Sequence, residues 1–162
     1  MHNNGENGST DMTLDYSNLF VACPDFGGKY EVQTCDSHKK EQELRKINLT
    51  SPLCNSMFKY AGNGNISSAT DDEDINYDID KVLNLNQQTL KDNRKVIYQQ
   101  LNDRFKSYSK NNNFNQGTLR KELSHWLGKD KQGQSKEYCM VAVYLIKKHM
   151  DKLSKKQSAY EG

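Results

Sequence analysis

Residues 135–156, "SKEYCMVAVYLIKKHMDKLSKK", decide the fold, because they contain the densest run of apolar side chains in the sequence. The uninterrupted run "MVAVYLI" is far shorter than the roughly 18 to 20 residues that span a bilayer, so it does not predict a membrane anchor. A helix that is apolar on every side over two turns is enclosed by other elements, and the polar flanks extend this pattern beyond strand length. We predict a central helix whose core positions are Tyr138, Val141, Ala142, Leu145, Ile146 and Met150.

Two further amphipathic helices precede this one. Residues 86–110 carry apolar side chains at spacings of seven, four and three, and residues 119–128 again place theirs on one face. Thr118 is positioned to cap the second of these helices and Gly128 to end it, while Ser135 can cap the final helix. Three consecutive helices joined by short polar loops predict a bundle. The two stripes are Leu90, Ile97, Leu101, Phe105 and Tyr108 in the first helix, and Leu119, Leu123, Trp126 and Leu127 in the second.

The N-terminal half has less regular patterns. Residues 24–35, "PDFGGKYEVQTC", are typical of a turn that enters a brief strand. Residues 37–49, "SHKKEQELRKINL", contain an N-cap residue, good helix formers and apolar Leu44 and Ile47 at helical spacing. They predict a helix that ends before Ser51-Pro52.

Composition sets the domain boundaries. Residues 1–13 are rich in Asn, Gly and Ser without periodicity, so we expect a disordered tail there and a second one at 158–162. A chain of 162 residues suits one core. We expect a single helical domain over residues 14–157, with residues 61–80 as an acidic mobile loop within it. The predicted fold is mainly α, a small helical bundle with a disulfide-stapled N-terminal segment that contains a turn and leaves room for a short strand.

Four cysteines supply the predicted staples. They form no C-x-x-C pair and lack a histidine at finger-like spacing, so a structural zinc site is not expected. Of the three possible pairings, we favour Cys23 with Cys35 and Cys54 with Cys139. Each bridge would stabilise the fold by about 3 to 5 kcal/mol on the chain-entropy model. The alternative is four reduced thiols in a cytosolic protein.

Charge is unevenly distributed along the chain, although the formal net charge is only +2. Most acidic residues lie in residues 1–82, with a cluster in "TDDEDINYDID", and residues 83–156 have an excess of Lys and Arg. Such a dipolar chain can present a basic surface to an acidic partner. The interpretation that we favour is that the acidic segment folds back over the basic helices.

The sequence contains no local catalytic motif. Phosphate-binding loops, nucleophile elbows and zinc-protease helices are absent from the sequence, and the acidic cluster lacks the Gly and Glu of an EF-hand loop, so we expect neither cofactor nor metal. Cys139 and His149 lie ten residues apart, which places them about 15 Å from each other on a straight helix. His125 could approach either residue only through folding. A secreted hydrolase or nuclease toxin using His125, His149 or Cys139 is therefore the alternative function.

Binding to another protein is the function that we favour. Phe114 stands alone inside "NNNFNQG" and is the best candidate for an exposed aromatic anchor. Lys147 and Lys148 are candidate charged contacts with the partner. A nucleic-acid binder is a second alternative, which the scattered lysines and the sequence pI of about 8.2 do not favour.

The predicted staples also indicate a compartment. Disulfides persist in oxidising surroundings, so we expect a secreted or periplasmic protein, such as an effector, inhibitor, immunity protein or helical ligand. The first residues have neither a basic start nor an apolar run, so we expect that a leader peptide is absent from this sequence.

Overall fold

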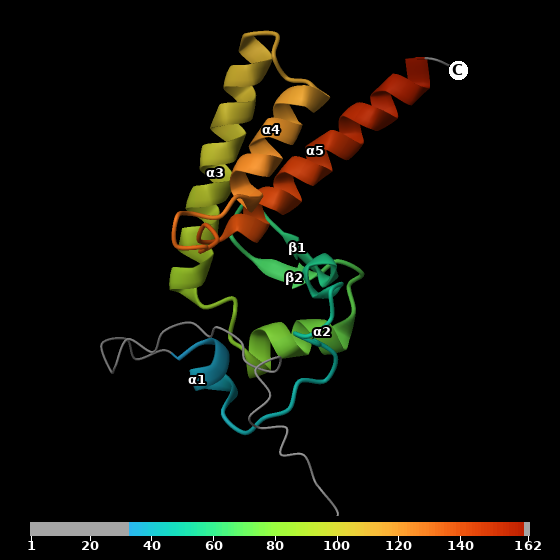
Figure 1. The fold of residues 1–162 in the computed structure, drawn as a ribbon. Coiled ribbons are helices and arrows are strands. Elements are labelled where there is room, and N and C mark those ends of the chain that lie inside the picture. The colour runs from blue at the N-terminus through green and yellow to red at the C-terminus, as the bar shows by residue number, and fades with distance from the viewer. Residues whose placement is uncertain (1–32, 161–162) are drawn as a thin grey trace, which may run out of the picture.

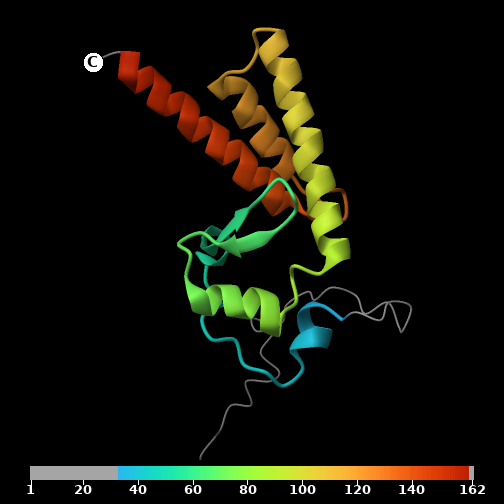
Figure 2. The same ribbon diagram turned by 180° about the vertical axis from the view of Figure 1, so that it is seen from behind.

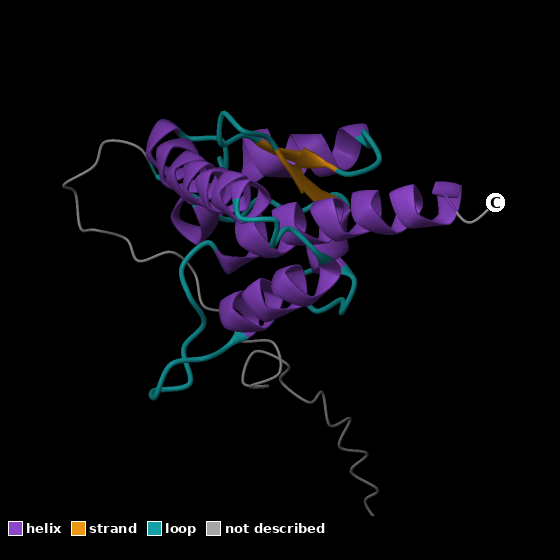
Figure 3. Cartoon of the chain, turned by 90° about the horizontal axis from the view of Figure 1, so that it is seen from above, coloured by secondary structure: helices purple, strands orange, loops and turns teal. Residues whose placement is uncertain are grey.

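The structure is a computed structural model that describes residues 33–160, and it confirms a mainly helical fold. Three long helices form a bundle, and a two-stranded hairpin lies between this bundle and a shorter helical segment (Figures 1 and 2). Figure 3 shows how small the sheet is beside the helices. The elements are α1 (Cys35–Lys39), η3 (Cys54–Met57), β1 (Phe58–Tyr60), β2 (Ile66–Ser68), α2 (Glu73–Tyr77), the π-helical η4 (Asp78–Val82), α3 (Gln88–Lys110), α4 (Gln116–Leu127) and α5 (Cys139–Tyr160).

The first half of helix α5 is the enclosed central element that the sequence predicts, whereas the predicted core residues Tyr138 and Met150 are only half-buried and Tyr138 precedes the helix. Ala142 and Ile146 are fully buried against α3 and α4, while Val143 on another side of the helix is only 3% exposed. The hairpin covers part of this helix. The rings of Tyr60 on β1 and Tyr144 on α5 meet edge to face, with their centroids 5.6 Å apart. The run is apolar all round because it packs on the bundle and on the hairpin at the same time. No helix in residues 33–160 combines the length and hydropathy that a bilayer span requires.

The bundle helices lie close to their predicted positions, with differences at their ends. Helix α4 begins one turn earlier than expected because Asn115, rather than Thr118, is its N-cap and accepts a hydrogen bond from the Thr118 amide at 3.0 Å. Helix α5 begins at Cys139 because Ser135 is used in an isolated bridge to Lys129. It continues to Tyr160, so residues 158–160 are helical rather than a disordered tail. Leu127, predicted on the core face, is 55% exposed at the last residue of α4.

The predicted helix over residues 37–49 is wrong. Helix α1 ends at Lys39, and the following backbone is irregular because Asp78 draws its amide groups away from helical bonding. The buried Asp78 carboxylate accepts hydrogen bonds from the backbone N–H groups of Arg45 (2.8 Å), Lys46 (2.8 Å) and Ile47 (2.9 Å). Three consecutive donors pointing at one carboxylate cannot also bond to carbonyls four residues back. A long-range contact therefore overrides the local helix propensity.

The prediction of an acidic mobile loop over residues 61–80 is wrong. These residues contain β2, α2 and the start of η4. Asp72 caps α2 by accepting hydrogen bonds from the amides of Asp74 and Ile75. The π-helical turn places Ile79 in the same core as Ile66 of the hairpin. A second core forms there from Ile47, Ile66, Ile75, Ile79 and Leu83.

The hairpin turn is fastened to α3 by Arg94. Its buried guanidinium donates from Nε to the carbonyl oxygen of Gly64 at 2.6 Å and from Nη2 to that of Leu85 at 2.5 Å. Gly64 has a φ of +86°, and a Cβ there would lie 2.0 Å from the carbonyl oxygen of Lys91. Only glycine therefore allows the turn to approach α3 this closely.

The predicted Cys54–Cys139 bridge is wrong, because both residues carry free thiols. The connection that the bridge would have supplied comes from apolar packing between β1 and α5, including the Tyr60–Tyr144 contact. Cys23 lies outside the described residues, as do most of the predicted turn and strand at 24–35. The Cys23–Cys35 pairing stays a prediction.

Candidate functional site

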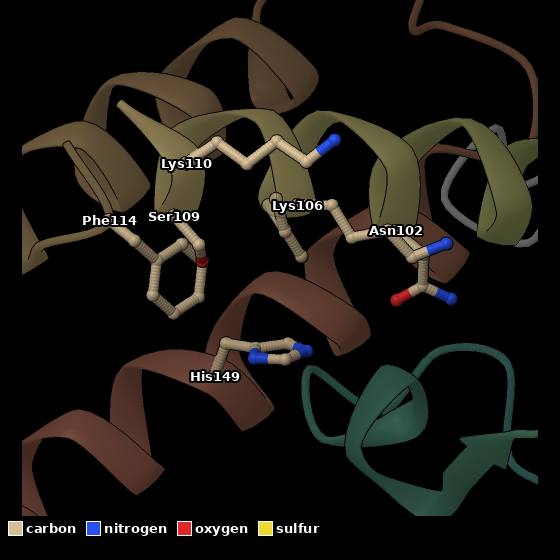
Figure 4. Close-up of a pocket in the computed structure, with 7 residues that line it drawn as sticks. Asn102, Lys106, Ser109, Lys110, Phe114 and His149 are labelled. Atoms are coloured by element: carbon tan, nitrogen blue, oxygen red, sulfur yellow. The ribbon is translucent and has the colours of Figure 1, made fainter. Parts of the chain in front are cut away.

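An open groove of about 510 Å³ runs between α3 and α5 and is closed at one end by the loop that leads into α4. Figure 4 shows side chains from α3 on one wall, His149 of α5 on the other and Phe114 at the end. The groove is lined by Asn102, Phe105, Lys106, Ser109, Lys110, Phe114 and His149.

Three aromatic rings form the apolar floor of the groove. The ring of Phe105 lies 4.9 Å from that of His149 and 5.6 Å from that of Phe114, and the rings of Phe114 and His149 are also 5.6 Å apart. All three contacts are edge to face, which is a favourable arrangement for aromatic rings. Phe105 belongs to the bundle core, whereas Phe114 and His149 are half-buried and leave part of their surface in the groove.

Most polar side chains of the groove are not bonded within the described part of the chain. In residues 33–160, the side chains of Asn102, Ser109 and Lys110 form no hydrogen bond or ion pair, and neither ring nitrogen of His149 does. The interface between α3 and α4 differs, because Glu122 there accepts two hydrogen bonds from Arg104 at 3.0 Å. The groove therefore presents donors and acceptors that a ligand can use.

The groove lies in the basic part of the chain. Residues 83–162 contain sixteen Lys and Arg against seven Asp and Glu. The expectation that the acidic segment folds back over the basic helices is wrong. Within residues 33–160, the ion pairs of this segment are all with residues of the N-terminal half. Those pairs are Asp71 with Lys59, Asp72 with Lys46, and Asp74 with Arg45 at 3.3 Å.

The surroundings of His149 disfavour its charged form. Its pKa lies below the usual value of 6.5, first because burial disfavours the charged imidazolium and then because Lys152 and Lys148 repel a further positive charge. Within the described residues, no acidic side chain contributes to this shift. The two ammonium groups favour an anionic ligand near the imidazole.

The structure brings together two of the residues that the sequence singles out and separates the others. Phe114 and His149 meet in the groove, although the first was chosen as a binding anchor and the second as a possible catalytic base. The Nζ atom of Lys148 lies over the Tyr144 ring, 5.7 Å from its centroid. Lys147 is exposed and, at about 100° per residue, points roughly 200° away from His149 around α5.

The candidate catalytic residues do not form a site. Cys139 and His149 share the continuous helix α5, so the helical rise keeps them about 15 Å apart along its axis. His125 is exposed on α4, where its ring lies 6.2 Å from that of Trp126. Among residues 33–160, no group of three His, Cys, Asp or Glu side chains is arranged to hold a metal ion.

Sequence reasoning missed the α3 wall of the groove. Asn102, Lys106 and Ser109 recur at spacings of four and three, and Lys110 follows Lys106 by four, so they lie beside the predicted apolar stripe on one side of the helix. That signal is present in the sequence, but it does not say which helix lies opposite. Comparison with known proteins adds no further assignment, since no family model, curated protein or solved structure matches the chain.

Proposed function

We propose that the protein is a binding module that recognises another protein through the groove between α3 and α5. The proposal is supported by one observation above the others: polar side chains without partners surround the half-buried Phe114 and His149 on a basic bundle. Protein interfaces typically combine an aromatic anchor with surrounding polar contacts. Catalysis is a weaker proposal, because His149 is surrounded by phenyl rings and ammonium groups and has no carboxylate to orient it.

Selection from a displayed library of random peptides tests this function with the full chain. Binders are selected on the wild-type protein and then screened against Ser109→Trp, which fills the groove from an exposed position, and against Phe114→Ala. We expect peptides that bind the wild type and lose affinity for both variants. A parallel selection uses a random pool of single-stranded oligonucleotides.

The two selections give a clear decision. If no peptide depends on the groove, the proposed function is wrong. If only oligonucleotides depend on it, the protein is a nucleic-acid binder instead. Far-ultraviolet circular dichroism of both variants must match the wild type. Ser109→Trp keeps the test valid if Phe114→Ala unfolds the bundle, because Ser109 is not part of the core.

The exported location belongs to the same proposal and now depends on the Cys23–Cys35 pairing alone. Alkylation of the unreduced protein, followed by mass spectrometry, should modify Cys54 and Cys139 and leave the other two cysteines unmodified. Modification of all four would remove the support for an oxidising compartment.

A further inference from the structure

The groove also indicates which kind of protein segment it binds. Resting on the proposed function, we infer that the ligand is an acidic segment that places one bulky apolar side chain against Phe114 and His149, with carboxylates on both sides of it. The inference combines the apolar floor with the charges on the two walls.

The α3 wall carries two cations, and a third lies on α5 close to His149. Lys106 and Lys110 lie one turn apart on α3, about 6 Å along the helix axis. On α5, Lys152 is one turn beyond His149, and its charge contributes to the low pKa of that imidazole. Lys106 pairs with Asp103 at 2.9 Å, but both side chains are 72% exposed, so this contact is easily exchanged for a ligand carboxylate.

The floor favours a side chain over a series of nucleotide bases. Successive bases of a single strand stack on exposed ring faces. Here the three rings are inclined to one another by 62°, 63° and 88°, so no two of them offer parallel faces. Phe105 is also only 4% exposed. A Phe or Leu side chain can instead contact the exposed parts of Phe114 and His149.

The polar groups between the floor and the lysines fit a peptide backbone. The amide of Asn102 can both donate and accept, and the hydroxyl of Ser109 can do the same. Both are on the α3 wall and unbonded within the described residues. A peptide whose apolar side chain occupies the floor would bring its own N–H and C=O groups to this wall.

Defined peptides test the inference with the full-length chain. The probe is a short peptide with one Phe between two pairs of Glu, compared with a version in which Gln replaces every Glu and one in which Ala replaces Phe. Fluorescence anisotropy measures each dissociation constant. We expect the Gln version to bind about tenfold more weakly, from several exposed charge contacts. The Ala version should lose about tenfold or more, from the buried ring.

Two variants of α5 provide a matched pair. Lys152→Gln removes a cation beside the groove, whereas Lys147→Gln removes one from the opposite side of the same helix. Only the first should weaken binding of the acidic peptide, and added salt should reduce the difference between them. Both variants should keep the wild-type helix content.

The outcomes separate this inference from the proposed function. If library peptides bind the groove but the Gln peptide binds as tightly as the Glu peptide, the ligand class is wrong and the binding function stands. Equal losses for Lys152→Gln and Lys147→Gln would also overturn the inference, because they would indicate a general charge effect. Competition by an oligonucleotide of equal charge would overturn it in favour of nucleic acid.

Discussion

Replacing Asp78 should destabilise the protein more than replacing any other acidic residue of the 71–80 segment. Its carboxylate is fully buried and accepts hydrogen bonds from three consecutive backbone amides, those of Arg45, Lys46 and Ile47. Hydrogen bonds to a charged group contribute roughly 1.5 to 3 kcal/mol each, and a buried donor without a partner costs about 1 to 3 kcal/mol. The Ile47 amide is buried, whereas the other two bonds are only partly buried.

About 2 kcal/mol for the buried bond and about 1 kcal/mol for each of the two partly buried bonds give an expected loss of about 4 kcal/mol in the free energy of unfolding for Asp78→Ala. That is a large fraction of the roughly 5 to 15 kcal/mol that stabilises an ordinary domain. Asp78→Asn keeps one accepting oxygen and replaces the other with a donor, so about half of this loss is expected. Asp74→Asn, four residues earlier, is the control, because its ion pair with Arg45 joins side chains that are both half-exposed.

Urea unfolding followed by circular dichroism measures all three variants. The midpoints should fall in the order Asp74→Asn, Asp78→Asn, Asp78→Ala, with slopes close to the wild type. Amide exchange at Ile47 should accelerate in Asp78→Ala under native conditions. An Asp78→Ala variant within about 1 kcal/mol of the wild type would refute the reasoning, because water would then be replacing the carboxylate.

Three further positions test other contacts. Gly64→Ala should lower the free energy of unfolding by about 2 kcal/mol or more, because residue 64 has a left-handed φ and the new Cβ would clash with the carbonyl oxygen of Lys91. An unchanged urea midpoint would contradict this prediction. Burial raises the pKa of Tyr60 to about 12, so an absorbance titration should show a late tyrosinate step that Tyr60→Phe removes. Because the unfolded chain loses that proton first, stability should fall as pH rises from about 10 to about 12. The pKa of His149 is lowered, so the unfolded state binds the proton first and the free energy of unfolding should fall as pH drops below about 6.5. His149→Gln should flatten this pH dependence. An NMR titration that gives His149 an ordinary pKa would contradict the prediction. Protonation of His149 should also tighten binding of the acidic peptide over the same interval.

The bundle could be predicted from the sequence because its signals are local. Apolar side chains at helical spacing placed α3, α4 and α5, and the run from Val141 to Ile146 correctly indicated an element enclosed on all sides. Helix ends were less accurate. Asn115 and Thr118 are both good N-cap residues, so the sequence does not distinguish them. The start of α4 is determined by its docking on α5, where Gln116 Nε2 donates a hydrogen bond to the carbonyl oxygen of Met150 at 2.8 Å.

The N-terminal half could not be predicted in the same way, because distant residues determine its conformation. Residues 37–49 have good helix propensity, but the carboxylate of Asp78 captures their amides from more than thirty positions away. Residues 61–80 resemble a loop in composition, yet the apolar Ile66, Ile75 and Ile79 are sufficient to form a second core with Ile47. A small number of apolar residues at the right positions determined the structure of this segment more than its average polarity did.

The location of the groove allows binding and folding to be measured separately. Arg94 connects α3 to the hairpin, and the groove begins at Asn102, about 12 Å further along the helix axis. The side chains of Asn102 and Lys110 form no hydrogen bond or ion pair within the described residues, so replacing either one removes no such interaction from the fold. A variant at these positions that binds more weakly while unfolding at the wild-type urea concentration has therefore lost a ligand contact. Substitutions at Phe105 cannot be interpreted in this way, since that ring belongs to both the groove and the bundle core.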